Sequence, residues 1–235
     1  MSVRDPLKSR EHYLKTTRED EAEVEQHEKL HLPPLNAPLS LLRVARARYS
    51  AGESVAECRN AINAAANWRM EFFRRNEYHL LGYGTIAMDL EVFGGAALVD
   101  RAAELAGALR RCTIKAPPPP PLAALMKQHI ALWLGEKPAL TQQEAAALCK
   151  VARPWAALPK VFEAVMVHDL EGLVAGLEIY LTHTWARDVK AAAREVGYAG
   201  RWCFLAAGLC QHVQVVPNLT AQAADYVPVE LLALP

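Results

Sequence analysis

Apolar residues recur along most of the chain at intervals of three and four, a spacing that places them on one side of an α-helix. The clearest stripe follows i, i+3, i+4, i+7 and i+11 and consists of Leu170, Leu173, Val174, Leu177 and Leu181. The two-residue alternation typical of a β-strand is nearly absent, and proline or glycine separates the periodic segments. We therefore predict an all-α fold, a compact bundle of roughly ten helices arranged as two packed halves.

Helix-capping residues at the ends of these segments support the prediction of helices. Residues 54–57 (Ser-Val-Ala-Glu) and 141–144 (Thr-Gln-Gln-Glu) have the spacing of a capping box, in which two side chains satisfy free amides of the first helical turn. Near the N-terminus, Asp5 followed by Pro6 predicts a helix that Asp5 caps. That helix is expected to continue until the prolines at residues 33 and 34 end it.

Five consecutive prolines at residues 117–121 divide the chain. A proline run lacks amide donors and favours an extended polyproline II conformation, so it predicts a stiff connector. We place an N-terminal helical module at residues 1–115, the connector at residues 116–121 and a C-terminal helical module at residues 122–235. A second interpretation is that the prolines are a Pro-x-x-Pro ligand for a partner protein.

The composition is that of a globular protein: the 235 residues are 52% hydrophobic and 22% charged, and the chain is long enough to bury a substantial core. Lys and Arg together number 26, as do Asp and Glu, and this balance argues against direct binding of nucleic acid. No apolar run approaches the roughly 18 residues of a membrane-spanning helix. Five scattered cysteines without a Cys-x-x-Cys pair are typical of reduced thiols. We therefore expect a cytoplasmic protein that binds neither membrane nor nucleic acid directly.

One catalytic motif is present, because residues 27–31 read His-Glu-Lys-Leu-His. In zinc peptidases with this spacing, the two histidines bind the metal and the glutamate activates the bound water. A zinc-dependent hydrolase built on His27, Glu28 and His31 is therefore the alternative function. The acidic segment before the motif and the prolines after it favour a solvated helix face instead. The main expectation is a protein that is not an enzyme, with no catalytic residue, metal or other cofactor.

Two groups of carboxylates are candidates for binding a basic partner. The first lies in residues 161–180, a span without Lys or Arg, and comprises Glu163, Asp169, Glu171 and Glu178. The second lies in the charged N-terminal segment and includes Glu21 and Glu25. Carboxylates gathered in this way attract a positively charged surface and accelerate the encounter. A structural interpretation also stays open, because Asp169 can cap a helix and long charged helices are often simply solvated.

Short motifs near both ends of the chain and in its first quarter carry a resemblance to a known family. They are Arg4-Asp5-Pro6-Leu7-Lys8, Arg48-Tyr49-Ser50-Ala51-Gly52, the seven residues that begin at Tyr198, and Asp225-Tyr226-Val227-Pro228. In order and composition they resemble the motifs of the PoNi family. These are immunity proteins that neutralise PoNe-type DNase toxins in bacterial competition, a setting that includes type VI secretion.

The resemblance implies a helical antitoxin that binds a cognate toxin protein, in the first place a DNase. A nuclease must bind phosphates, so its cleft is expected to be positive, and an inhibitor can fill it with carboxylates. The expected mechanism is steric occlusion combined with charge complementarity. Trp202 is expected to be a core anchor, so the motifs themselves should be architectural and the partner surface should lie elsewhere.

Overall fold

The computed structural model describes residues 3–30, 37–75, 83–112, 118–216 and 218–233. Within these ranges the secondary structure consists of helices joined by turns, without a strand, so the predicted all-α bundle is confirmed. None of the helices in this part of the chain is both long and apolar enough to cross a membrane.

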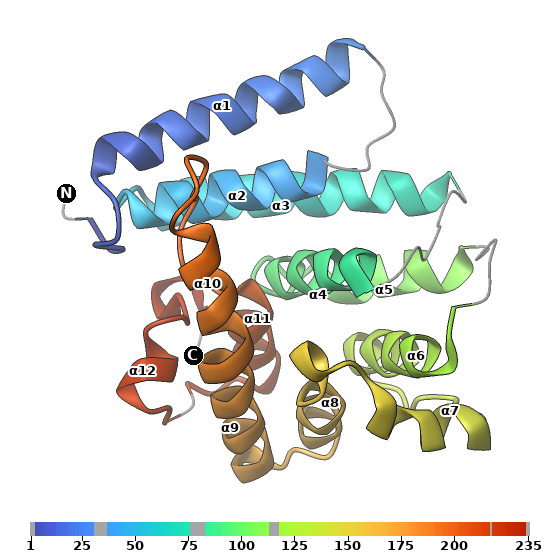
Figure 1. Cartoon of the computed structure of the whole chain (residues 1–235). Coiled ribbons are helices and arrows are strands. Elements are labelled where there is room, and N and C mark those ends of the chain that lie inside the picture. Colours follow the sequence, from blue (N-terminus) through green and yellow to red (C-terminus); the bar gives the residue numbers. More distant parts are fainter. Residues whose placement is uncertain (1–2, 31–36, 76–82, 113–117, 217, 234–235) are drawn as a thin grey trace.

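The N-terminal layer consists of three helices, of which α1 and α3 both pack against α2 (Figure 1). Their bounds are Arg10–Lys29 for α1, Ala37–Ser50 for α2 and Val55–Arg74 for α3. The capping box predicted at residues 54–57 is present and begins α3. Local sequence therefore decides where α3 starts, and packing against α2 decides where it lies.

The start of α1 differs from the prediction. The cap at Asp5 is wrong: the helix begins at Arg10, where the Ser9 hydroxyl accepts a hydrogen bond from the His12 N–H at 3.2 Å. Asp5 lies in the turn before the helix and is fully buried. The reason is tertiary, because other parts of the chain bind its carboxylate.

The middle of the chain contributes five helices. Their bounds are Tyr83–Ala97 for α4, Ala102–Arg111 for α5, Pro120–Leu134 for α6, Gln142–Ala147 for α7 and Leu158–Met166 for α8. The predicted capping box at residues 141–144 is present and begins α7. Pro120 and Pro121 form the first turn of α6, where a missing amide donor costs no hydrogen bond, so the end of the proline run is helical and not part of an extended connector. Residues 113–117 lie outside the described ranges.

The described part of the last third of the chain contains four α-helices, a π-helical segment and a short 3₁₀ helix at Val229–Leu231. The bounds are Leu170–Ile179 for α9, Ala186–Ala192 for α10, Phe204–Val213 for α11 and Ala221–Ala224 for α12. The π-helical segment, Tyr180–Trp185, joins α9 directly to α10. Asp169 caps α9 as predicted, since its carboxylate accepts a hydrogen bond from the Gly172 N–H at 2.9 Å.

Helix α11 packs closely against α4 and so joins the last part of the chain to its middle in one hydrophobic core. Gly94 and Gly208 permit this approach. A Cβ atom added at Gly94 would lie 2.4 Å from the Cα of Leu205, and one added at Gly208 would lie 2.3 Å from the carbonyl oxygen of Gly94. Core residues on both sides of the proline run belong to the same cluster. The division into modules at 1–115 and 122–235 stays a prediction, and of the predicted connector at 116–121 the last two residues belong to α6.

Helices α3 and α4 are also joined by a buried ion pair. The guanidinium of Arg69 lies 2.6 Å from the Asp89 carboxylate and packs over the rings of Phe72 and Phe73. Arg69 is fully buried. Removing either charge would leave the other unpaired in the core, which typically costs about 3–5 kcal/mol.

Candidate functional site

The motifs from the two ends of the chain meet at Asp5. Its carboxylate accepts hydrogen bonds from the Tyr198 hydroxyl at 2.9 Å and from the backbone N–H of Arg201 at 3.2 Å. The other carboxylate oxygen accepts from the Leu7 N–H at 3.1 Å, and the Tyr13 hydroxyl donates to the Asp5 carbonyl oxygen at 3.2 Å. Four donors converge on one residue, which is why Asp5 does not cap α1.

Arg4 attaches the same N-terminal segment to the end of α2. Its guanidinium donates to the carbonyl oxygens of Tyr49 at 3.1 Å and Glu53 at 3.0 Å. It also lies 2.7 Å from the Glu230 carboxylate and 4.5 Å from the centre of the Tyr49 ring. One side chain therefore links the N-terminal segment, the end of α2 and the C-terminal tail.

Trp202 completes the connection, and the prediction that it is a core anchor is confirmed. Its indole N–H donates to the Ser50 hydroxyl at 2.8 Å, and its ring meets the Tyr49 ring edge-on at 4.8 Å between centroids. Gly200 has φ +137°, and a Cβ atom there would lie 2.2 Å from the Ser50 Oγ. We call the following set the motif junction: Arg4, Asp5, Tyr49, Ser50, Tyr198, Gly200 and Trp202.

Burial affects the titration of three groups at or next to the motif junction, the phenols of Tyr13 and Tyr198 and the thiol of Cys203. Burial, followed by the negative charge of Asp5, raises the pKa of the Tyr13 and Tyr198 hydroxyls, so both serve as hydrogen-bond donors. Burial likewise raises the pKa of the neighbouring Cys203 thiol well above its usual value. A protonated thiol and two protonated phenols suit a structural role better than nucleophilic chemistry.

A second buried carboxylate, Glu91 of α4, holds the N-terminus of α11. It accepts hydrogen bonds from the backbone N–H groups of Phe204 at 3.1 Å and Leu205 at 3.4 Å, and it forms an ion pair with Arg46. Arg46 in turn donates to the Trp202 carbonyl oxygen at 2.9 Å. No local pattern marks Glu91 or Arg46, because these partners lie 113 and 156 residues away in the sequence.

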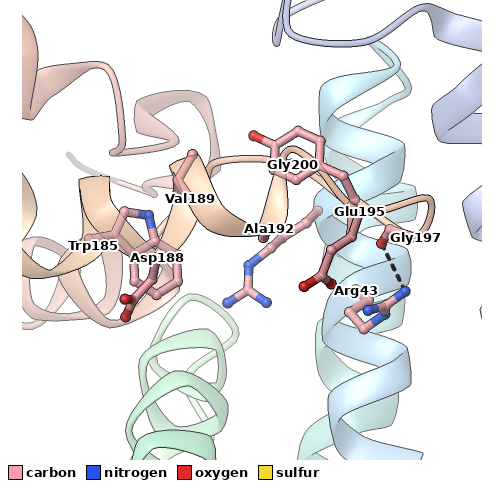
Figure 2. Close-up of a pocket in the computed structure, with 11 residues that line it drawn as sticks. Arg43, Trp185, Asp188, Val189, Ala192, Glu195, Gly197 and Gly200 are labelled. Atoms are coloured by element: carbon pink, nitrogen blue, oxygen red, sulfur yellow. Dashed lines mark hydrogen bonds between the residues drawn. The ribbon is translucent and has the colours of Figure 1, made fainter.

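A pocket of about 190 Å³ opens beside the motif junction, between α2, α10 and the segment that follows α10 (Figure 2). Val189 and Ala192 line it from α10, and Trp185 lines it from the end of the π-helical segment. Asp188 and Glu195 add two exposed carboxylates to the lining. The pocket therefore has an apolar wall with negative charge near it.

The arginines that line this pocket are engaged by the protein itself. Arg43 contacts the Asp20 carboxylate at 3.1 Å and donates to the Gly197 carbonyl oxygen at 2.9 Å, the bond that is dashed in Figure 2. Arg46 is paired with Glu91. Because both guanidinium groups already have carboxylate partners, the pocket does not favour an anionic substrate.

The carboxylates of α1, the second candidate group, are used in two ways. Glu21 pairs with Arg48 of α2 at 2.5 Å and so helps to hold α1 on α2. Glu25 makes a solvent-exposed pair with Lys29 one turn further along α1, at 3.4 Å. Exposed pairs of this kind typically contribute only about 0–1 kcal/mol. In Figure 1, α1 lies along the top of the molecule and the turn between α8 and α9 lies at the bottom, so the two candidate groups are far apart.

The His-Glu-x-x-His motif is only partly described. His27 and Glu28 lie in the last turn of α1, and His31 falls outside the described residues. The Nε2 atom of His27 is 3.9 Å from the carboxylate of Glu23 in the preceding turn. Among the residues that the structure places, no three His, Cys, Asp or Glu side chains are grouped to hold a metal ion. The contacts of His27 and Glu28 therefore give no support to the zinc-hydrolase alternative.

The first candidate group borders a groove of about 450 Å³ between α8 and α9, which we call the α8–α9 groove. Glu163 and Asp169 line it together with Val167 and Ile179, whose side chains are 66% and 53% exposed. The remaining residues that line the groove are Ala157, Lys160, Ala164, Gly172, Ala175 and Gly176. Exposed apolar side chains bordered by carboxylates are typical of a surface that binds another protein.

The four carboxylates of this group differ in what they bind. Glu163 and Glu171 are exposed, and neither forms an ion pair within the described ranges. Asp169 caps α9. Glu178 accepts a hydrogen bond from the Thr220 hydroxyl at 2.7 Å and another from the Thr220 N–H, so it holds the start of α12. Glu163 and Glu171 are the two that remain available to a partner.

Sequence reasoning missed the apolar part of this surface. Leu170 belongs to the regular apolar stripe of this helix, but it is 44% exposed, whereas Leu173 and Leu177 are buried. Ala175 and Ile179 lie one turn apart on a second face of α9. The sequence indicated this second face only through the spacing of Ala175 and Ile179. The position of α8 shows that the two residues line a groove.

No known protein family matches the chain, and no curated protein or solved structure has significant similarity to it. The resemblance to the PoNi family therefore rests on the short motifs alone. Seven of these motif residues, drawn from three of the four motifs, form the motif junction, where their contacts are structural.

Proposed function

We propose that the protein is a cytoplasmic immunity protein that binds a cognate antibacterial toxin, in the first place a DNase, and covers its active-site cleft. It acts by binding alone, with no catalytic step and no cofactor. The partner is the toxin protein, and the inhibitor contacts neither nucleic acid nor membrane directly.

The observation that carries this proposal is the pairing of unused carboxylates with exposed apolar side chains at the α8–α9 groove. Glu163 lines the groove together with Val167 and Ile179, is exposed and has no ion-pair partner in the described part of the chain. Glu171, in the first turn of α9, is also exposed and forms no ion pair there. Leaving large apolar side chains in water is unfavourable unless a partner covers them. Carboxylates around them favour a partner with a positive surface, such as the phosphate-binding cleft of a nuclease.

The arrangement of the motifs also supports the proposal. Residues from three of the four motifs that resemble the PoNi family form the motif junction, which joins the two ends of the chain. Such residues identify a fold, while the partner surface is free to differ between toxins. This is the division of roles expected of immunity proteins that share an architecture and recognise different targets.

Charge reversal at the groove tests the proposal. Glu163→Lys with Glu171→Lys places two positive charges on the surface where a positive cleft would dock, so we expect at least a hundredfold loss of affinity for the cognate toxin. The toxin is co-purified with wild-type or variant protein, affinity is measured by calorimetry, and protection is scored in a sensitive bacterial strain. Glu178 is left unchanged because it holds α12.

A matched control carries the same change in net charge at a distance from the groove. Glu11→Lys with Glu195→Lys alters two exposed glutamates that form no ion pair among the described residues. We expect this control to bind and protect like the wild type. Equal protection by the groove variant and the control would remove this surface from the interface, and a failure of the wild type to bind the toxin would overturn the function itself.

A further inference from the structure

The α8–α9 groove has a shape that suits one kind of occupant. Helices α8 and α9 contain nine and ten residues and are joined by a short turn through His168, which has φ +55°. Each helix is therefore about 14 Å long, which corresponds to between two and three turns. Two adjacent helices of this length form a groove that fits a third helix of similar length.

The floor of the groove is made of small residues. Ala164, Gly172, Ala175 and Gly176 all line it. A Cβ atom added at Gly176 would lie 2.5 Å from the Cγ2 of Val161, so the two helices already approach closely at this point. A floor without large side chains leaves room for the large side chain of an incoming helix.

The two ends of the groove differ in charge. Glu163 and Asp169 lie close to the turn that joins the helices, beside Val167. Lys160 lies about one turn before Glu163 on α8, further from the connecting turn, where the chain direction places it opposite the end of α9. The negative charge is therefore concentrated at the turn end, and the apolar Ile179 lies toward the other end.

We propose that the α8–α9 groove binds an amphipathic helix of the partner. One or two of its large apolar side chains rest on the small-residue floor between Val167 and Ile179, and a Lys or Arg side chain pairs with Glu163 and Asp169. This inference rests on the proposed function for the identity of the partner as a toxin. The groove's own preference for a basic amphipathic helix follows from its shape and charge and can be tested separately.

The test uses a synthetic helix as probe. A fluorescein-labelled peptide of 15 residues carries Leu at helical positions i, i+3, i+4 and i+7 with Lys on the flanking positions, and a second peptide replaces every Lys by Glu. Binding is measured by fluorescence anisotropy at moderate salt. We expect the Lys peptide to bind saturably and the Glu peptide to bind at least tenfold more weakly. Equal binding of both peptides, or binding of neither, would overturn the inference.

Variants locate the site. Ala175→Trp fills the groove from an exposed position, and we expect it to weaken binding of the Lys peptide at least tenfold. Ala191→Trp adds the same side chain at an exposed position of α10 and should leave binding unchanged. Ile179→Ser removes apolar surface without filling the groove and should weaken binding about fivefold, so the test does not depend on the tryptophan variant alone. Unchanged binding in both groove variants would show that the peptide sits elsewhere.

The same variants separate this inference from the proposed function. If Ala175→Trp protects a sensitive strain as well as the wild type does, the groove is not the docking site even though the protein is an inhibitor. If the wild type gives no protection but binds the Lys peptide in a manner that Ala175→Trp abolishes, the groove inference holds and the immunity function fails. If light scattering shows a dimer that Ala175→Trp converts to a monomer, the occupant is a second copy of this chain and the inference is overturned.

Discussion

The motif junction and the α8–α9 groove are opposite kinds of surface. At the motif junction, residues from three distant segments are buried and their polar groups are bonded to one another, as in the contacts of Asp5 with Tyr198 and Arg201. At the groove, Val167 and Ile179 are exposed and Glu163 has no ion-pair partner in the described ranges. The first is recognisable in sequence and does structural work, whereas the second carries no motif and is the better candidate for function.

This difference teaches how the resemblance to the PoNi family should be used. A motif is easiest to recognise where each residue is constrained by its contacts, as at the motif junction, where Asp5 accepts a buried hydrogen bond and a Cβ atom at Gly200 would clash with Ser50. A binding surface must match a partner and has no such internal constraint. The motifs therefore indicate a fold, whereas the groove is the surface that indicates a function.

The largest expected effect is the loss of stability when a buried residue of the motif junction is replaced. Asp5→Ala removes the acceptor for the Tyr198 hydroxyl and for the Arg201 and Leu7 N–H groups, and a buried donor without a partner costs about 1–3 kcal/mol. We expect the free energy of unfolding in urea to fall by about 3–5 kcal/mol. Asp188→Ala, an exposed carboxylate, should change it by less than about 0.5 kcal/mol. A loss below about 1 kcal/mol for Asp5→Ala would mean that the junction does not hold the two ends together.

A smaller effect is expected from backbone geometry at the motif junction. Gly200→Ala introduces a Cβ atom 2.2 Å from the Ser50 Oγ at φ +137°, so both strain and a steric clash oppose it. We expect a loss of about 2–4 kcal/mol in the free energy of unfolding. Gly135→Ala is the matched control: its φ is +66° and its Cβ atom would meet no atom within 4 Å, so only the backbone strain remains, about 1 kcal/mol. Similar losses in both variants would show that Ser50 and Gly200 are not tightly packed.

The third effect is a pH dependence of stability that arises from His129, a buried residue whose ring, unlike Asp5, has no hydrogen-bond partner among the described residues. The ring of His129 is buried against Phe93 and Phe162, and both its nitrogens lack a hydrogen-bond partner among the described residues. Burial lowers the pKa of His129 to about 3. The unfolded chain therefore takes up a proton near pH 6.5 while the folded protein does not. The stability that this histidine contributes is complete above pH 6.5 and decreases as the pH falls from 6.5 toward 3.

We expect His129 to account for a loss of about 2 kcal/mol in the free energy of unfolding between pH 7 and pH 5. The measurement is urea unfolding at several pH values for the wild type and His129→Leu, in which this contribution is absent. His183→Leu, at an exposed histidine, should retain the pH dependence of the wild type. The same pH dependence in the wild type and His129→Leu would contradict the expected pKa of His129.

Sequence was sufficient where the controlling contacts are local. The capping boxes at residues 54–57 and 141–144 and the cap at Asp169 were all predicted, because each joins atoms only three residues apart. The same reasoning failed at Asp5, whose hydrogen-bond donor Tyr198 is 193 residues away. It also gave no indication of the Glu91 contacts with α11, for the same reason.

For the candidate site, the carboxylates of residues 161–180 could be named from the sequence, but their roles could not. Glu178 accepts a hydrogen bond from Thr220, whereas Glu163 has no ion-pair partner among the described residues, although both belong to the same acidic segment. Exposure of Leu170 also contradicts its place in a regular apolar stripe. Which residue of a helix faces a groove depends on the neighbouring helix, and no periodicity within one helix contains that information.

The amino-acid order alone therefore determined that this chain is helical, where several of its helices begin, and which carboxylates gather in one segment, because all of these depend on neighbours within one or two helical turns. Tertiary structure decided that Asp5 joins the two ends of the chain, that α4 and α11 touch through Gly94 and Gly208, and that α8 and α9 leave an open groove. Those features depend on contacts between distant segments, whose geometry is set only when the whole core packs.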